Sequence, residues 1–147
     1  MRIREHEGLA YSVFSDLGVF DDSGMLYVYA GTSTDNARRV VNNIIEEMKR
    51  LKEVLVDEEE LRRAKDYMKG SLTLSLESTS SRMSNLARQE RYFQRFTSID
   101  ELHDKIEQVD SSSICEVADE WFGEEKVSLA MLGDLKGLSI SQVVLKF

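Results

Sequence analysis

Residues 9–30 read LAYSVFSDLGVFDDSGMLYVYA, and this stretch decides the fold because it encodes two strands and the turn between them. Apolar and polar residues alternate through much of residues 9–20, with β-branched and aromatic side chains throughout, which is typical of a half-buried strand. The DDSG turn at residues 21–24 supplies residues that tolerate the backbone angles of a tight reversal. Residues 25–30 then return as a second strand, so we expect an antiparallel hairpin here.

Helical patterns fill most of the remaining chain, with apolar residues at helical spacing and charges on the opposite face. Residues 71–76 alternate like a strand, but they continue an established helix and we assign them to it. Residues 126–132 are expected to form a buried strand. The fold class is therefore α+β, with a mostly antiparallel sheet covered on one face by helices. The expected helices begin after residues that can cap them, namely Ser33, Asp57, Ser78, Ser98 and the serines at 111–113.

Composition excludes several classes of function. The chain has 147 residues and a net charge of −8, from 19 Lys and Arg against 27 Asp and Glu, so we do not expect nucleic acid as a partner. No apolar run approaches the roughly 18 residues of a membrane helix, and no signal-peptide pattern is seen. The single cysteine, Cys115, allows no internal disulfide and has a helical, apolar setting. A reducing, cytoplasmic location fits these features best.

Residues suited to catalysis are sparse. The two histidines, His6 and His103, stand far apart, and neither has a second histidine one helical turn away, as zinc sites of the His-Glu-x-x-His type or its inverse require. No serine stands in a Gly-x-Ser-x-Gly turn, and no glycine-rich phosphate loop is present. Composition and spacing alone therefore predict a domain without a catalytic centre of its own.

The segment RIREHEGLAYSVFS at residues 2–15 changes this interpretation. It resembles a junction in the second half of zinc metallopeptidases of the insulinase (pitrilysin) family, which includes the mitochondrial processing peptidases. The sequence YAGTS at residues 29–33, the segment LESTSSRM at 76–83 and the apolar run at 127–133 are similar to later parts of the same domain, in the same order. The resemblance covers nearly all of residues 2–134.

The resemblance implies a mechanism shared between two homologous domains. The first domain holds zinc through His-x-x-Glu-His and a distant Glu, and the second faces it across a chamber. The second domain supplies an Arg and a Tyr, seven residues apart, that contact the substrate near the scissile bond. Arg4 and Tyr11 match these positions, although the residue types alone would make Arg4 a surface charge and Tyr11 a packed strand residue.

These matches lead to a set of expectations about the protein. The chain lacks His-x-x-Glu-His, so we expect it to bind no cofactor itself, to be inactive alone and to need a zinc-bearing first-half partner. We expect one domain at residues 1–134 and a tail at 135–147. The family's first strand and helix are missing, and an unpaired strand edge predicts a homo-oligomer formed through exchange of strands or other elements. The predicted function is the substrate-binding half of an endopeptidase that hydrolyses peptides or processes presequences; the alternative is a non-catalytic partner or scaffold subunit.

Overall fold

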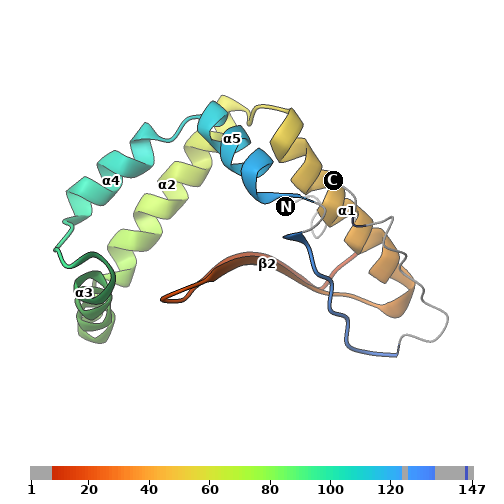
Figure 1. The fold of residues 1–147 in the computed structure, drawn as a ribbon, viewed down its shortest axis with the longest axis horizontal. Helices are drawn as coiled ribbons and strands as arrows, with labels where there is room; N and C mark the ends of the chain where they lie inside the picture. The colour runs from red at the N-terminus through yellow and green to blue at the C-terminus, as the bar shows by residue number, and fades with distance from the viewer. Residues whose placement is uncertain (1–7, 124–125, 135–144, 146–147) are drawn as a thin grey trace. The chain divides into compact units, whose positions relative to one another are not determined.

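The structure is a computed structural model that describes residues 8–123, 126–134 and 145 (Figure 1). These residues contain two strands and five helices. They form two compact units, one containing the hairpin, α1 and the end of α5, the other containing α2, α3, α4 and the start of α5. The elements are β1 (Ser12–Val19), β2 (Gly24–Gly31), α1 (Thr34–Glu53), α2 (Glu58–Ser75), α3 (Thr79–Phe93), α4 (Ile99–Gln108) and α5 (Ser111–Trp121). The expected α+β class is confirmed.

The hairpin has the expected antiparallel pairing. Its register places Ser12 opposite Gly31 and Val19 opposite Gly24, and Phe20 N donates to Ser23 O at 2.9 Å across the turn. Because side chains alternate along a strand, Val13 and Ala30 fall on one face, whereas Phe14 and its partner fall on the other. The two faces therefore differ in what they can contact.

One face of the hairpin packs against α1. Leu9, Ala10 and Val40 are buried together, and Val13, Ala30 and Ile44 pack around them as partly buried neighbours. Val40 is 1% exposed, and it comes from the apolar stripe that the helical spacing predicted. This cluster confirms that a helix covers one face of the sheet.

The predicted strand at residues 126–132 is wrong. These residues adopt no strand conformation, and Leu132 is 104% exposed. A run of apolar residues becomes a strand only where a neighbour can complete its hydrogen-bond ladder, and the hairpin makes no such ladder with this segment in the described part of the chain. The segment has the apolar pattern of a strand, but no strand of the described residues pairs with it.

Side-chain caps begin α2, α3 and α4 as expected, whereas α5 is capped by Asp110 and not by one of the serines at 111–113. Asp57 accepts hydrogen bonds from the backbone N–H groups of Glu59 and Glu60, and Ser98 accepts one from Glu101. Residues 71–75 are helical within α2, as predicted. By contrast, Ser33 precedes α1 without a side-chain cap bond. None of the helices in the described ranges is long and apolar enough to cross a membrane.

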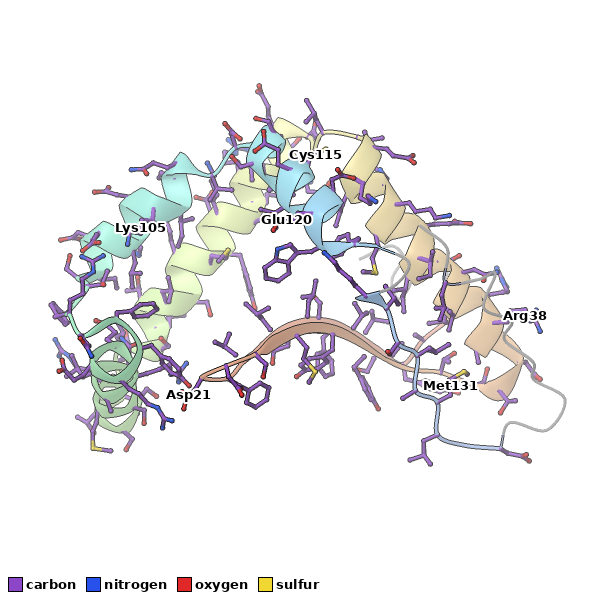
Figure 2. All side chains as sticks on the ribbon, in the orientation of Figure 1. Asp21, Arg38, Lys105, Cys115, Glu120 and Met131 are labelled. Carbon is purple, nitrogen blue, oxygen red and sulfur yellow. The ribbon has the colours of Figure 1, made fainter. Side chains whose placement is uncertain are left out.

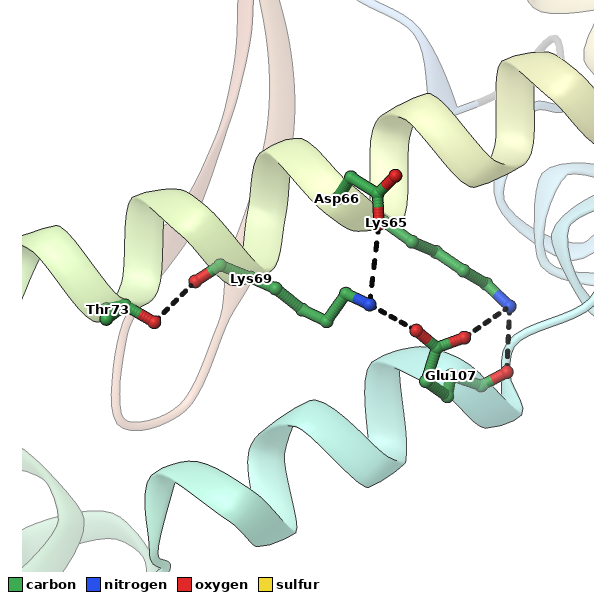
Figure 3. A network of polar contacts seen from close by, with 5 residues as sticks. All are labelled: Lys65, Asp66, Lys69, Thr73 and Glu107. Carbon is green, nitrogen blue, oxygen red and sulfur yellow. Dashed lines mark hydrogen bonds and ion pairs between the residues drawn. The ribbon is translucent and has the colours of Figure 1, made fainter.

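A charged network joins α2 to α4, which lie side by side (Figures 1 and 3). The Glu107 carboxylate pairs with Lys69 and lies 3.8 Å from Lys65 Nζ, and Lys65 Nζ also donates to Glu107 O at 2.7 Å. Asp66 lies 3.5 Å from Lys69 Nζ and completes the network. The hydrogen bond from Lys69 lowers the pKa of Glu107 and raises that of Lys69.

Asp110 caps α5, and the pKa of its carboxyl group is shifted more strongly than that of any other acid in the described residues. Asp110 Oδ1 accepts hydrogen bonds from Ser113 N at 2.8 Å, from Ser113 Oγ at 2.7 Å and from Ser112 Oγ at 2.9 Å. The backbone hydrogen bond from Ser113, followed by these hydroxyl bonds, lowers the pKa of Asp110 to about 2. The charged carboxylate is thus the form that the helix start favours.

We expect acid to weaken the second unit through Asp110. A group with a depressed folded pKa stabilises the fold above its unfolded pKa and loses that contribution as the pH falls through the folded value. For Asp110 the window runs from the ordinary 3.8 down to about 2. Urea midpoints measured by far-UV circular dichroism should fall across this window. Asp110→Asn keeps a capping oxygen but does not titrate, so its midpoint should change less; an equally steep fall in the variant contradicts this assignment.

Candidate functional site

The segment from Gly8 to Tyr11 forms the entry to the hairpin and carries the predicted site residue Tyr11. Gly8 has φ +61, a left-handed conformation that glycine adopts without strain. Leu9 is 5% and Ala10 9% exposed, and the Thr32 hydroxyl donates to Leu9 O. Both side chains and the backbone are therefore fixed against the first unit immediately before Tyr11.

Tyr11 itself points its side chain into solvent. Its backbone N donates to Gly31 O at 2.8 Å, which holds the residue beside the end of β2. Its side chain is nevertheless exposed, with 79% of the residue's surface accessible. The interpretation in which Tyr11 packs in the sheet is therefore wrong: Tyr11 precedes β1, and its side chain is exposed.

Arg4 lies outside the described residues, so the predicted pairing of Arg4 with Tyr11 stays a prediction. The spacing of seven residues between them is a property of the sequence. Of the two predicted site residues, the structure therefore places only Tyr11.

The described residues do not fit a zinc ion. No group of three or more His, Cys, Asp or Glu side chains comes together within them that could hold a metal. His103 lies in α4, and its Nε2 is buried without a hydrogen-bond partner in the described structure. His6 is outside the described residues, so the expected absence of a metal site in the whole chain stays a prediction.

An apolar groove runs along the α1 side of the hairpin in the first unit. It has a volume of about 960 Å³. Leu17, Val19 and Trp121 line it while remaining 50%, 60% and 47% exposed. Exposed apolar surface of this extent is typical of a face that contacts another protein segment. Further lining residues come from β2, α1 and residues 127–130, among them Leu26, Val28, Ile44, Ile45, Met48 and Leu129.

The opposite face of the hairpin carries an aromatic and acidic cluster that sequence reasoning missed. Phe14 and Tyr29 are cross-strand partners whose rings stack with centroids 5.0 Å apart, and Tyr27 meets Phe14 edge-on at 6.3 Å. The Tyr27 hydroxyl donates to Asp16 Oδ2 at 3.0 Å, and this bond, with smaller effects of burial and charge, raises the pKa of Tyr27. We call Phe14, Asp16, Tyr27 and Tyr29 the outer cluster. The signal that could have found it is the hairpin register, which pairs residues 14 and 16 with 29 and 27.

The outer cluster is open to solvent. Phe14, Tyr27 and Tyr29 are 45%, 37% and 51% exposed, and Asp16 is exposed as well. Figure 2 shows side chains projecting from both faces of the hairpin, with Asp21 at its turn. The hairpin thus presents two chemically different faces, an aliphatic one towards α1 and an aromatic, acidic one away from it.

One protein-family model matches the first part of the chain. Residues 1–68 match the family model described as the Peptidase M16 inactive domain. An uncharacterized zinc protease of Bacillus subtilis, YmxG, is 37% identical over 123 residues, covering 84% of this chain and 30% of that protein. A zinc protease of Mycobacterium bovis, Mb2805c, is 40% identical over 119 residues, covering 79% of this chain and 26% of that protein. The chain thus spans less than a third of the length of these relatives.

Solved structures share the fold at lower identity. A chain of complex III from Candida albicans matches with a TM-score of 0.75 and 20% identity, over 83% of this chain and 29% of that one. A conserved protein from Enterococcus faecalis matches with a TM-score of 0.68 and 24% identity, over 81% of this chain and 28% of that one. At these identities the likeness concerns the fold.

Removing the Leu9 side chain should loosen the entry to the hairpin. Leu9→Ala should lower the free energy of unfolding by about 3 kcal/mol, because a buried leucine leaves a cavity as well as losing its transfer energy. Leu17→Ala, at a half-exposed position of β1, should cost less than about 1 kcal/mol. Urea denaturation of both variants measures the difference. Equal losses would show that Leu9 does not anchor the segment.

Proposed function

Because the chain belongs to the insulinase family of peptidases, as its inactive C-terminal domain, we propose that it is the substrate-binding half of a zinc-dependent endopeptidase. The zinc would be held by a homologous first half that carries His-x-x-Glu-His, where the metal supplies an activated water. The observation that carries the proposal is the exposed Tyr11 side chain beside two buried residues. Its role as a substrate contact is inferred from the resemblance of residues 2–15 to the family's junction.

Tyr11 would act as a hydrogen-bond donor. Attack of water on a peptide carbonyl puts negative charge on the carbonyl oxygen, and a phenol O–H aimed at that oxygen stabilises it. Such a donor is effective when it does not reorganise during the reaction. The buried Leu9 and Ala10 and the bond from Tyr11 N to Gly31 O supply that rigidity on the backbone side.

Arg4 would hold the substrate beside Tyr11. A guanidinium group offers several N–H donors in a fixed plane, which suits the carbonyl oxygens of an extended peptide. This role follows from the family position of Arg4 and from the spacing of seven residues to Tyr11. The two side chains would thus have different roles. Arg4 would bind the substrate in its ground state, and Tyr11 would stabilise the oxyanion that develops in the transition state.

The required partner is the zinc-bearing half, and the exposed groove supports a contact of this kind. Leu17, Val19 and Trp121 are large apolar side chains that remain about half exposed. We also propose a homo-oligomer, because a two-stranded hairpin is marginally stable and its outer edges are unpaired within the described residues. A cytoplasmic location and a role in processing presequences belong to the same proposal; the location rests on the lone thiol, Cys115.

The second candidate function is a non-catalytic partner or scaffold subunit. The observation that favours it is the similar fold of a chain of complex III from Candida albicans, a multi-subunit assembly by its name. The two candidates differ in one respect that can be measured. A substrate-binding half raises peptide hydrolysis by the zinc-bearing half, whereas a scaffold subunit associates with it and leaves hydrolysis unchanged.

The direct test is the activity of Tyr11 and Arg4 variants mixed with a zinc-bearing first half. Tyr11→Phe should lower kcat on a quenched-fluorescent peptide by about 100-fold or more with little change in KM, because the bond forms in the transition state. Arg4→Ala should mainly raise KM. Tyr67→Phe is the matched control, since Tyr67 is 77% exposed on α2.

Three results would overturn the proposal, and the first of them would favour the scaffold role. One is association without any gain in hydrolysis. Another is full activity of Tyr11→Phe, and the third is an equal loss in Tyr67→Phe. Zinc should be required throughout, so a chelator should abolish activity of the mixture.

A further inference from the structure

The segment from Leu9 to Tyr11 is tied by two hydrogen bonds to consecutive residues at the end of β2. Tyr11 N donates to Gly31 O at 2.8 Å, and Thr32 Oγ1 donates to Leu9 O. The two bonds stand on either side of Ala10, whose own side chain is buried. Both ends of this short segment are therefore held at the same point of the chain.

The pairing of the strands alone does not place this segment. β1 begins at Ser12, so Leu9, Ala10 and Tyr11 precede it. Leu9 and Ala10 are both buried, whereas successive residues of a regular strand point to opposite faces. An irregular segment of this kind takes its course from individual contacts, and the Thr32 hydroxyl supplies one of them.

The bond from Thr32 is suited to fixing a backbone position. It joins residues 23 positions apart and is partly buried, so water competes with it less than with an exposed bond. Threonine is β-branched, and its χ1 angle is restricted to few values. Removing the hydroxyl alone would leave the Leu9 carbonyl without this donor.

We propose that Thr32 is a positioning residue for Tyr11. The inference rests on the proposed function in taking the Tyr11 hydroxyl to be the group that acts on the substrate. Tyr11 is 79% exposed and has little protein around its ring, so the place of its hydroxyl depends on the backbone that carries it. Misplacing a reacting group by about 1 Å can lower a rate by about 100-fold. Thr32 itself makes no contact with the substrate in this scheme and acts only through residues 9–11.

Amide hydrogen exchange of the full chain tests the positioning without any catalysis. Thr32→Val removes the hydroxyl and keeps the branched shape of the side chain. We expect the Tyr11 amide, followed by NMR, to exchange about tenfold faster in this variant, because local opening of the segment breaks one hydrogen bond fewer. The amides of Val40 and Ile44 in α1 should keep their rates. Thr32→Ser retains the hydroxyl, so its Tyr11 amide should exchange as in the wild type.

Thr34→Val is the matched control. Thr34 Oγ1 donates to Asp134 O at 3.1 Å, so this variant also removes one hydroxyl bond, two residues further along, but none to residues 9–11. Its Tyr11 amide should exchange at the wild-type rate. Unchanged exchange at Tyr11 in Thr32→Val overturns the positioning role. Equally faster exchange at Tyr11 and in α1 overturns it too, since that result is a loss of global stability.

Kinetics with a zinc-bearing first half test whether the position matters for hydrolysis. Thr32→Val should lower kcat by about tenfold and change KM by less than about twofold, and Thr32→Ser should restore kcat. In a Tyr11→Phe background, Thr32→Val should lower kcat no further, because the hydroxyl that it positions is gone. An equal additional loss in that background overturns the inference.

The positioning role and the proposed function fail in different ways. If Tyr11→Phe keeps full activity, the proposed function fails, and the exchange rate of the Tyr11 amide still decides whether Thr32 holds the segment. If Tyr11→Phe loses activity while Thr32→Val keeps it, the positioning role alone fails.

Discussion

The contact of Leu9 and Ala10 with Val40 is the constraint on which the first unit depends. It ties the start of the hairpin to the middle of α1, and both strands contribute partly buried neighbours, Val13 and Ala30, around it. The next residue, Tyr11, lies outside this cluster with 79% of its surface exposed. This packing contact thus fixes which face of the hairpin α1 covers and which face stays open.

The elements predicted from local signals are the ones that the structure confirms. Caps such as Asp57 and Ser98 satisfy backbone N–H groups within a few residues, so their effect is contained in the sequence around them. The prediction of a strand at residues 126–132 was wrong for the opposite reason, since a strand needs a neighbour to pair with that can be distant in the sequence. Tyr11 was singled out through resemblance, while its exposure is a property that the alternation of residues 9–20 did not reveal.

The outer cluster illustrates a second limit of reading a sequence. Phe14, Asp16, Tyr27 and Tyr29 are separated by up to 15 positions, and they become neighbours only through the register of the hairpin. A shift of one residue would move each of them to the other face. The family resemblance pointed to the fold and to Tyr11, but it did not point to the aromatic and acidic character of this face.

We propose that Tyr11 contacts a peptide substrate when a zinc-bearing half faces it. Photo-crosslinking tests this most directly: a photoreactive phenylalanine analogue replaces Tyr11, and the control replaces Tyr67, which is equally exposed on α2. We predict an adduct between position 11 and a peptide substrate in the presence of the zinc-bearing half, with little or none at position 67. Absence of a peptide adduct at position 11, or equal adducts at both positions, would contradict the account.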